Sequence, residues 1–357
     1  MRRGVDFVLE GVTEEPVLSL LRGFSAPVKL EIERSEEELA FLMANDSDPF
    51  NKWEAGQEIE RSGEELAFQA NDSDPFNKWE AGQMLFQRTL LANTKASQEG
   101  KDMAVSDLLV KAVGAILADT TADPSLRAVS LGLPSLATLG EAVETIDPDA
   151  LVAALKFTKS AIAAALRPEF EAAYAAATLP ATGPILDPLT AAYAAATLPA
   201  TPFRNDAEAV ATLTATPFRN GAEAVGKRRI KNTCLDFLSS LKDAETIQMC
   251  LDQALTAGSM TDRVAATAQL AGSADDAART TALDDFYEKH AKGNDLILCK
   301  YFTMQAMADT DDALAKADKL LTHPDFSMKN PNKCRSLIGA FAGNTRHFHA
   351  KDGSGYA

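Results

Sequence analysis

The residues best suited to metal chemistry in this sequence are its four histidines, His290, His323, His347 and His349. A zinc peptidase of the thermolysin class needs the pattern H-E-x-x-H on a helix, where two histidines bind the metal and the glutamate activates a water. None of the histidines begins that pattern. His347 and His349 form an H-x-H pair, but their context reads as a loop without a third ligand. We therefore expect no metal site and no catalytic residue in this chain.

Acidic clusters are the next candidates for metal ligands. Asp46-Ser47-Asp48 and Asp309-Thr310-Asp311-Asp312 are such clusters, but both lack the spacing, glycine and glutamate of a calcium-binding EF-hand loop. Short acidic and hydroxyl side chains are also typical of helix N-caps, and we interpret both clusters in that way. The sequence also lacks the glycine-rich phosphate-binding patterns and the nucleophile elbow of hydrolases.

The four cysteines are Cys234, Cys250, Cys299 and Cys334. None forms a C-x-x-C pair, and all of them lie in apolar helical patterns. Paired cysteines at short spacing are what a structural zinc site requires, and a disulfide framework is typical of small secreted domains. Buried, reduced thiols are therefore the better interpretation.

Composition excludes several classes of function. The chain has 357 residues, is 46% hydrophobic, and carries 51 acidic against 35 basic residues, for a formal net charge of -16. Such a surface repels nucleic-acid phosphates and anionic lipids, so we expect neither nucleic acid nor membrane as a partner. No apolar run approaches the roughly 18 residues that span a bilayer. The first residues lack the apolar stretch of a secretory signal, which favours a cytoplasmic location.

The N-terminal region differs from the rest of the chain. Residues 5–9 and 28–32 have the composition of β-strands, and the second run alternates apolar and charged residues as a half-buried strand does. Two strands do not make a stable sheet alone. We interpret this region as the end of a β domain whose beginning is absent.

From Ser35 onward the pattern is helical. Asp147 and Pro148 suit the N-cap and first position of a helix, on which Leu151, Leu155, Ile162 and Leu166 share one face. Similar apolar faces recur to the end of the chain, separated by short loops and without strand signals. This organisation predicts an all-α fold, a superhelical stack of antiparallel helix pairs like an ARM or HEAT solenoid, with a short β remnant at the N-terminus.

Two regions contain near-identical duplications, at 31–83 and 172–225. Glu31–Gln57 is repeated almost unchanged as Glu58–Gln83, and Ala172–Thr182 recurs as Ala191–Thr201. A true solenoid shows diverged repeats along its whole length. These copies are local and unequal in period, so we interpret them as recent tandem duplications or as sequence errors. Met84–Phe86 should continue the helix that begins at Asp74 in the second copy.

Several stretches carry a family resemblance. They are Leu20–Glu31 (LLRGFSAPVKLE), Asn45–Gln57 with its DPFNKWEAGQ, Lys231–Leu238, Met260–Asp262, Phe326–Asn344 (FSMKNPNKCRSLIGAFAGN) and Phe348–Tyr356 (FHAKDGSGY). Together they resemble the C-terminal region of bacterial aminopeptidase N, the alanyl aminopeptidase of the zinc gluzincin family. The resemblance implies that residues 1–34 are the last strands of a truncated β-sandwich domain. It also implies that residues 35–357 are the helical C-terminal domain, with its last helices missing.

The resemblance implies a function without catalysis. In this family the zinc site and the G-A-M-E-N motif lie in a thermolysin-like domain, and both motifs are missing here. We therefore expect a non-catalytic fragment that caps the catalytic domain and shapes substrate access, while the parent enzyme holds the zinc and releases N-terminal amino acids from peptides. The implied partners are that catalytic domain and a peptide at the cavity wall. The alternatives are a free-standing helical-repeat binding scaffold and a pseudogene or misassembled product.

Arg335 is the one candidate site residue. It matches the arginine of the N-P-N-x-x-R-S motif, which in the family lies near the substrate cavity. A guanidinium there could meet the downstream carbonyl groups or the carboxylate of a peptide. The alternative is that Arg335 pairs with an acidic residue or caps a helix.

Overall fold

The computed structural model describes residues 75–178 and 220–356 continuously, together with residues 17–20, 22, 38, 41–42, 45–48 and 51. The chain divides into two compact units, Met1–Phe68 and Gln69–Ala357. The predicted strands at 5–9 and 28–32 lie outside the described residues, as does most of both duplicated regions. The β remnant and the boundary at 34/35 therefore stay predictions.

In the described residues of the second unit, every regular element is a helix. The α-helices and short helical turns are α4 (Pro75–Gln98), α5 (Asp107–Ala118), α6 (Pro124–Ser130), α7 (Leu136–Glu141), α8 (Pro148–Ala165), α9 (Arg167–Ala177), α12 (Ala222–Ser239), α13 (Ala244–Thr256), α14 (Met260–Ala271), α15 (Asp276–Phe286), α16 (Asp295–Ala306), α17 (Ala313–Leu321), α18 (Pro331–Cys334), α19 (Ala340–Ala342) and α20 (Thr345–Phe348). Two π-helical turns, η2 (Tyr287–Ala291) and η3 (Arg335–Gly339), and a final 3₁₀ turn, η4 (Ser354–Tyr356), complete the unit. The helix expected to run through Met84–Phe86 is α4.

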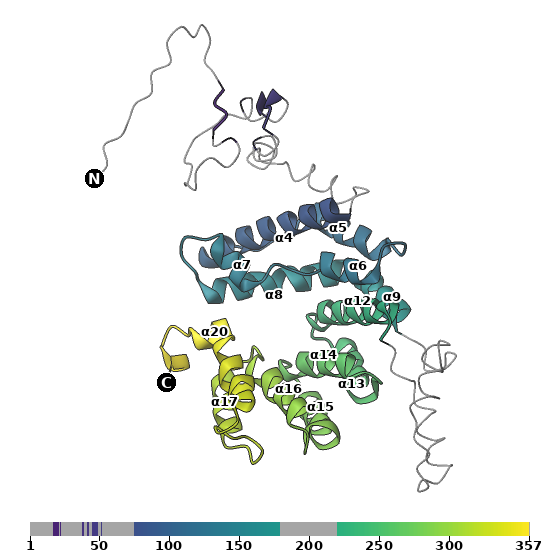
Figure 1. The fold of residues 1–357 in the computed structure, drawn as a ribbon, viewed down its shortest axis with the longest axis vertical. Coiled ribbons are helices and arrows are strands. Elements are labelled where there is room, and N and C mark those ends of the chain that lie inside the picture. Colours follow the sequence, from purple (N-terminus) through teal and green to yellow (C-terminus); the bar gives the residue numbers. More distant parts are fainter. Residues whose placement is uncertain are drawn as a thin grey trace, which may run out of the picture. The chain divides into compact units, whose positions relative to one another are not determined.

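These helices pack in neighbouring pairs that follow one another along the unit. Helix α4 packs on α8, α12 on α9, α13 on α14, and α16 on α17. Figure 1 shows the succession from the blue α4 and α8, through the green α12, α13 and α14, to the yellow-green α16 and α17. The predicted stack of helix pairs is confirmed.

Most helices begin at a side chain that satisfies a free backbone N–H group. An oxygen of the residue before the helix accepts a hydrogen bond from the first turn, as expected of an N-cap. This holds for Ser106, Asp123, Ser135, Asp147, Asp243, Ser259, Asp275, Asn294 and Asn330. Part of the excess of acidic residues is thus explained by local helix initiation, since a carboxylate also favours the positive end of the helix dipole.

Two arginines close the opposite ends of helices. Arg263 of α14 donates to the carbonyl oxygens of Ala254 and Ala257, at 2.6 Å each, where α13 ends. Arg127 of α6 donates to the carbonyl oxygen of Ile116 at 3.1 Å, where α5 ends. Each guanidinium therefore satisfies carbonyl groups that have no partner within their own helix, and so ties one helix to the next.

The core follows the predicted apolar faces. Leu151, Ile162 and Leu166 are buried. Leu155, on the same predicted face, is half-buried and faces a cavity instead of the core. Farther along, Phe237 stacks on Phe170 with 4.7 Å between ring centroids, which joins α12 to α9.

A buried polar network holds α9, α12, α13 and α14 together. Lys231 and Asp262 form an ion pair at 3.1 Å, with side chains only 10% and 11% exposed. Asn232 donates to the same carboxylate at 2.9 Å, and Gln253 donates to Asn232 and to the backbone carbonyl of Asp262. The hydroxyl of Tyr174 donates to Gln253 at 2.9 Å. Every member of the network has a partner, as a polar group in a low-dielectric interior requires.

Candidate functional site

Arg335, the predicted site residue, opens the π-helical turn η3 near the end of the chain. Its side chain is exposed, and it makes no ion pair or side-chain hydrogen bond with any residue that the structure describes. Two neighbouring residues have partners of their own. Lys333 pairs with Asp295 at 2.8 Å, and the backbone carbonyl of Ser336 accepts a hydrogen bond from Thr303 at 3.0 Å. Within the described residues, Arg335 therefore has neither the acidic partner nor the capping role of the alternative interpretation.

A cavity of about 950 Å³ lies in the second unit. Helices α8, α12, α13, α14 and α16 line it together with the loop from Leu131 to Leu136. Apolar groups such as Leu155 and Met304 alternate there with the hydroxyls of Ser160 and Ser240. Arg335 is not among the lining residues, although η3 packs against α16, which lines the cavity. The sequence did not predict this cavity, because its wall comes from five helices that are far apart in the chain.

A charged network crosses the wall of this cavity. Lys159 of α8 pairs with Asp236 of α12 at 2.7 Å, and Gln269 of α14 donates to the other oxygen of that carboxylate at 2.8 Å. Ser239 in turn donates to Gln269 at 3.0 Å. The network gives each of these four polar side chains of the wall a partner. A ligand here would have to compete with these partners, because the charges already neutralise each other.

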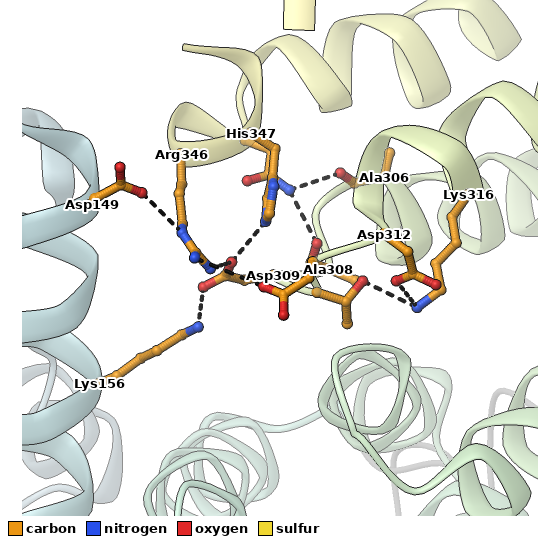
Figure 2. A network of polar contacts seen from close by, with 12 residues as sticks. Asp149, Lys156, Ala306, Ala308, Asp309, Asp312, Lys316, Arg346 and His347 are labelled. Atoms are coloured by element: carbon orange, nitrogen blue, oxygen red, sulfur yellow. Dashed lines mark hydrogen bonds and ion pairs between the residues drawn. The ribbon is translucent and has the colours of Figure 1, made fainter. Parts of the chain in front are cut away.

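A second network joins the end of the chain to α8 and centres on Asp309 (Figure 2). One carboxylate oxygen of Asp309 accepts from Arg346 at 2.9 Å and from His347 at 2.8 Å, and the other pairs with Lys156. Arg346 also pairs with Asp149 at 3.2 Å. These contacts hold α20 against α8 although the two helices are separated by almost two hundred residues. Asp309 and Lys156 also line the large cavity, so the network forms part of its wall.

The electrostatics of Asp309 follow from its three cationic or donor neighbours. Partial burial by itself would raise the pKa of this carboxyl group, but hydrogen bonds from Lys156, Arg346 and His347 outweigh that effect and lower the pKa to about 2. Asp309 is therefore ionised throughout the physiological range. The prediction that the cluster 309–312 consists of helix N-caps was wrong for Asp309, which links helices instead. Asp312 does precede α17, but its carboxylate pairs with Lys316 at 2.8 Å.

The histidines do not form a zinc site in the described residues. His347 contacts Asp309, whereas His349 shares a hydrogen bond with the hydroxyl of Tyr356. His323 accepts a hydrogen bond from the backbone N–H of Asp325, and His290 is one of the residues that form the π-helical turn η2. No three histidine, cysteine, aspartate or glutamate residues are grouped there as metal ligands would be. The residues that the structure describes therefore do not fit the zinc that the family resemblance places in the parent enzyme.

The structure adds features that sequence reasoning missed. Helix α15 passes into the π-helical turn η2, and α18 passes into η3. A π turn inserts one residue into a helix and so rotates the following side chains, and such turns are frequent at functional sites. In η3, Leu337 is buried, while the adjacent Ile338 is 44% exposed. Only the N-P-N pattern around Pro331 hints at an unusual local geometry.

Comparison with known proteins places the chain in a family. Residues 36–64 and 62–357 match a family described as a domain of unknown function (DUF3458_C) with ARM repeats. The chain belongs to this family. The shorter match lies mostly over the first copy of the duplicated segment at 31–83. Among the residues that the structure describes, no helix is both long enough and apolar enough to cross a membrane.

Curated relatives and a solved structure agree with this assignment. The DUF3458_C chain is 30% identical over 351 residues to aminopeptidase N of Escherichia coli, and 29% identical over 350 residues to aminopeptidase N of Caulobacter vibrioides. Each alignment covers 98% of this chain but only 33% of the relative, so the chain spans about a third of their length. A crystal structure of Legionella pneumophila aminopeptidase A, with aspartic acid bound, has the same fold, with a TM-score of 0.61 and 24% identity over 98% of this chain and 34% of that one.

Proposed function

We propose that this chain is the helical C-terminal part of an aminopeptidase of the N type, and that it covers a catalytic domain without cleaving peptides itself. The observation that carries the proposal is the alignment of nearly the whole chain with a third of several bacterial aminopeptidases N. The zinc and the water that attacks the peptide bond belong, on this proposal, to the remaining two thirds of the enzyme. The chain then limits which peptides reach the active site.

Arg335 supports a role at the boundary with the catalytic domain. Its guanidinium is exposed and is held at the first position of a π-helical turn in the last part of the helical stack. A planar guanidinium without a partner in the described chain is suited to bind a carbonyl oxygen or a carboxylate in a bidentate way. On this proposal, Arg335 binds the downstream end of a peptide substrate.

The proposal includes a cytoplasmic location. All four cysteines are free, and Cys234 and Cys250 are buried. Burial raises the pKa of both thiols to about 12, which keeps them in the unreactive protonated form. Free thiols of this kind are typical of a reducing compartment.

A chimeric enzyme tests the proposal. The matching third of E. coli aminopeptidase N is replaced by this chain, and hydrolysis of an alanyl tripeptide is compared with that of alanine p-nitroanilide. We expect Arg335→Ala to raise KM for the tripeptide about fivefold, the equivalent of roughly 1 kcal/mol, with little change in kcat. The anilide has no downstream carboxylate, so its KM should not change.

Lys300→Ala is the matched control, because Lys300 is an exposed cation on α16 with no ion pair or side-chain hydrogen bond to any described residue. It should leave both substrates unaffected. If Arg335→Ala and Lys300→Ala have the same KM for the tripeptide, the role proposed for Arg335 is wrong. A chimera that unfolds cooperatively yet has no activity would favour a free-standing binding scaffold instead.

A further inference from the structure

A smaller cleft of about 440 Å³ lies among α15, α16 and α17. The turn that follows α17, from Thr322 to Pro324, completes its wall. Among the described residues it has no lining residue in common with the 950 Å³ cavity. Its interpretation is therefore independent of the function proposed above.

The charge of this cleft is opposite to that of the chain. Its described wall contains the cationic side chains of Arg279, Lys316 and Lys319 together with His323, and no aspartate or glutamate. The whole chain, in contrast, carries a net charge of -16. Cationic groups gathered in a concave site concentrate the local field and attract an anion.

Two of the cations are fixed in place by neighbours outside the wall. Arg279 donates to the carbonyl oxygen of Ser273 at 2.7 Å and pairs with Asp276. Lys316 pairs with Asp312 at 2.8 Å and donates to Thr310 at 3.1 Å. Their side chains are only 18% and 22% exposed. These two groups shape the cleft and contribute a partly neutralised positive field.

Lys319 is the uncommitted charge. Its ammonium group makes no ion pair or side-chain hydrogen bond with any part of the chain that the structure describes, and the side chain is exposed at the rim. An ammonium group carries three donors. Lys319 can therefore close on an anion without first breaking an internal contact.

His323 supplies a fixed neutral donor. Its Nδ1 accepts a hydrogen bond from the backbone N–H of Asp325 at 3.1 Å, so in the neutral ring the proton is on Nε2. The ring is held edge-on against Tyr287 and Phe302, with centroids 5.1 and 5.5 Å away. Burial lowers the pKa of His323, which favours this neutral form. Nε2–H is thus the nitrogen left to bind a ligand.

The remaining wall is mainly apolar, with Gln305 and Thr322 as its other polar residues. Leu283, Tyr301, Leu320 and Pro324 contribute hydrocarbon or aromatic surface beside the polar groups. Ligand sites combine such surface with a few fixed polar groups, and the volume lies within their usual range of roughly 300–1,000 Å³. We propose that this cleft binds a small organic anion, whose carboxylate or phosphate lies between Lys319 and His323 and whose apolar part packs on Tyr301 and Leu320.

Binding of benzoate to the full chain tests the proposal, with neutral benzamide as the isosteric comparison. Isothermal titration should show saturable binding of benzoate, at least about fivefold tighter than benzamide, as the loss of one charge-assisted contact implies. Lys319→Ala should weaken benzoate binding about fivefold, and Lys300→Ala should leave it unchanged. Phenyl phosphate in a parallel titration identifies which oxyanion is preferred.

The imidazole resonances report the location of the site. The Nε2–H signal of His323 is assigned as the one that disappears in the variant His323→Gln. Benzoate should shift this signal and leave the imidazole signals of His347 and His349 in place. Equal affinity for benzoate and benzamide would overturn the proposal, as would equal behaviour of the two lysine variants. Absence of saturable binding of both benzoate and phenyl phosphate to a chain with a cooperative thermal transition would overturn it as well.

Discussion

Asp309 has more charged and hydrogen-bonding neighbours than its sequence context indicates. It joins Lys156 of α8 to Arg346 and His347 near the chain end, and its side chain is 26% exposed. In such a partly buried place, three donors stabilise the carboxylate more than desolvation destabilises it. The consequence is a dependence of stability on pH that can be worked out from this one residue.

Asp309→Asn should lower the free energy of unfolding at pH 7 by about 2 kcal/mol. The pKa is about 2 in the folded chain and 3.8 ordinarily, so the folded state gains stability from the charge above about pH 4. That gain is lost as the pH falls from about 4 towards 2, where the variant and the parent should become equal. Urea unfolding at several pH values measures the difference.

Asp311→Asn is the control for that measurement. Asp311 lies 3.8 Å from Arg346, but its side chain is 99% exposed. An exposed pair at that distance contributes little, and we expect no more than roughly 0.5 kcal/mol. Equal losses in the two variants would show that Asp309 is not the centre of the network.

At the scale of the elements, α12, α13 and α14 are held together by a charge pair as well as by apolar packing. The pair between Lys231 and Asp262 joins α12 to α14, and Gln253 brings in α13. A buried pair of this kind does not guarantee stability, since desolvation offsets much of the attraction. Breaking it, however, leaves an uncompensated charge in the interior.

Asp262→Ala should therefore destabilise the chain by about 3–5 kcal/mol, because Lys231 loses its partner where water cannot replace it. Asp252→Ala is the matched control, since the only hydrogen bond that its carboxylate accepts from a described residue is the exposed one from Gln248. It should change stability by less than roughly 0.5 kcal/mol. Chemical denaturation measures the loss of stability in both variants. A loss below about 1 kcal/mol for Asp262→Ala, close to that of the control, would contradict the role of the network.

The turn between α20 and η4 is another element with a specific requirement. Phe348 packs edge-on against Tyr356, with centroids 5.0 Å apart, and His349 bonds to the Tyr356 hydroxyl. A Cβ atom at Gly355 would overlap the backbone carbonyl oxygens of Phe348 and His347. Only glycine fits that close approach.

Gly355→Ala should open this turn and let trypsin cleave the backbone after Lys351, whose side chain is already exposed. We expect cleavage after Lys351 to be at least about tenfold faster than in the parent chain, because cleavage follows local opening and about 1.4 kcal/mol of lost stability is tenfold. Gly258→Ala is the control, since a Cβ there meets nothing within 4 Å. An unchanged cleavage rate at Lys351 would show that the turn tolerates the methyl group.

At the scale of the whole chain, the features that sequence predicted are those with local causes. The Asp147–Pro148 start of α8 was predicted from adjacent residues, and the structure confirms it, with Asp147 accepting from the backbone N–H of Ala150. The repeated apolar spacing seen in the sequence likewise ends in burial on α12, where Ile230, Cys234, Phe237 and Leu238 are all buried. Local hydrogen bonding and periodicity suffice for such features.

Features that depend on distant residues could not be predicted. The partners of Asp309 come from α8 and α20, and no single-sequence pattern links Lys156 to Arg346. The cavities have the same origin, as their walls are made by several helices. For Arg335, the family resemblance indicated a role at a cavity between domains. The structure shows that Arg335 is exposed, and its role at the cavity stays a prediction.

The central claim is that this chain covers the catalytic part of an aminopeptidase of the N type. The most direct test mixes the purified chain with E. coli aminopeptidase N truncated by its matching third, and follows sedimentation velocity together with hydrolysis of an alanyl peptide. We predict a one-to-one complex that is more active than the truncated enzyme, while the chain alone is inactive. Two species that sediment independently, with no gain in activity, would contradict the account.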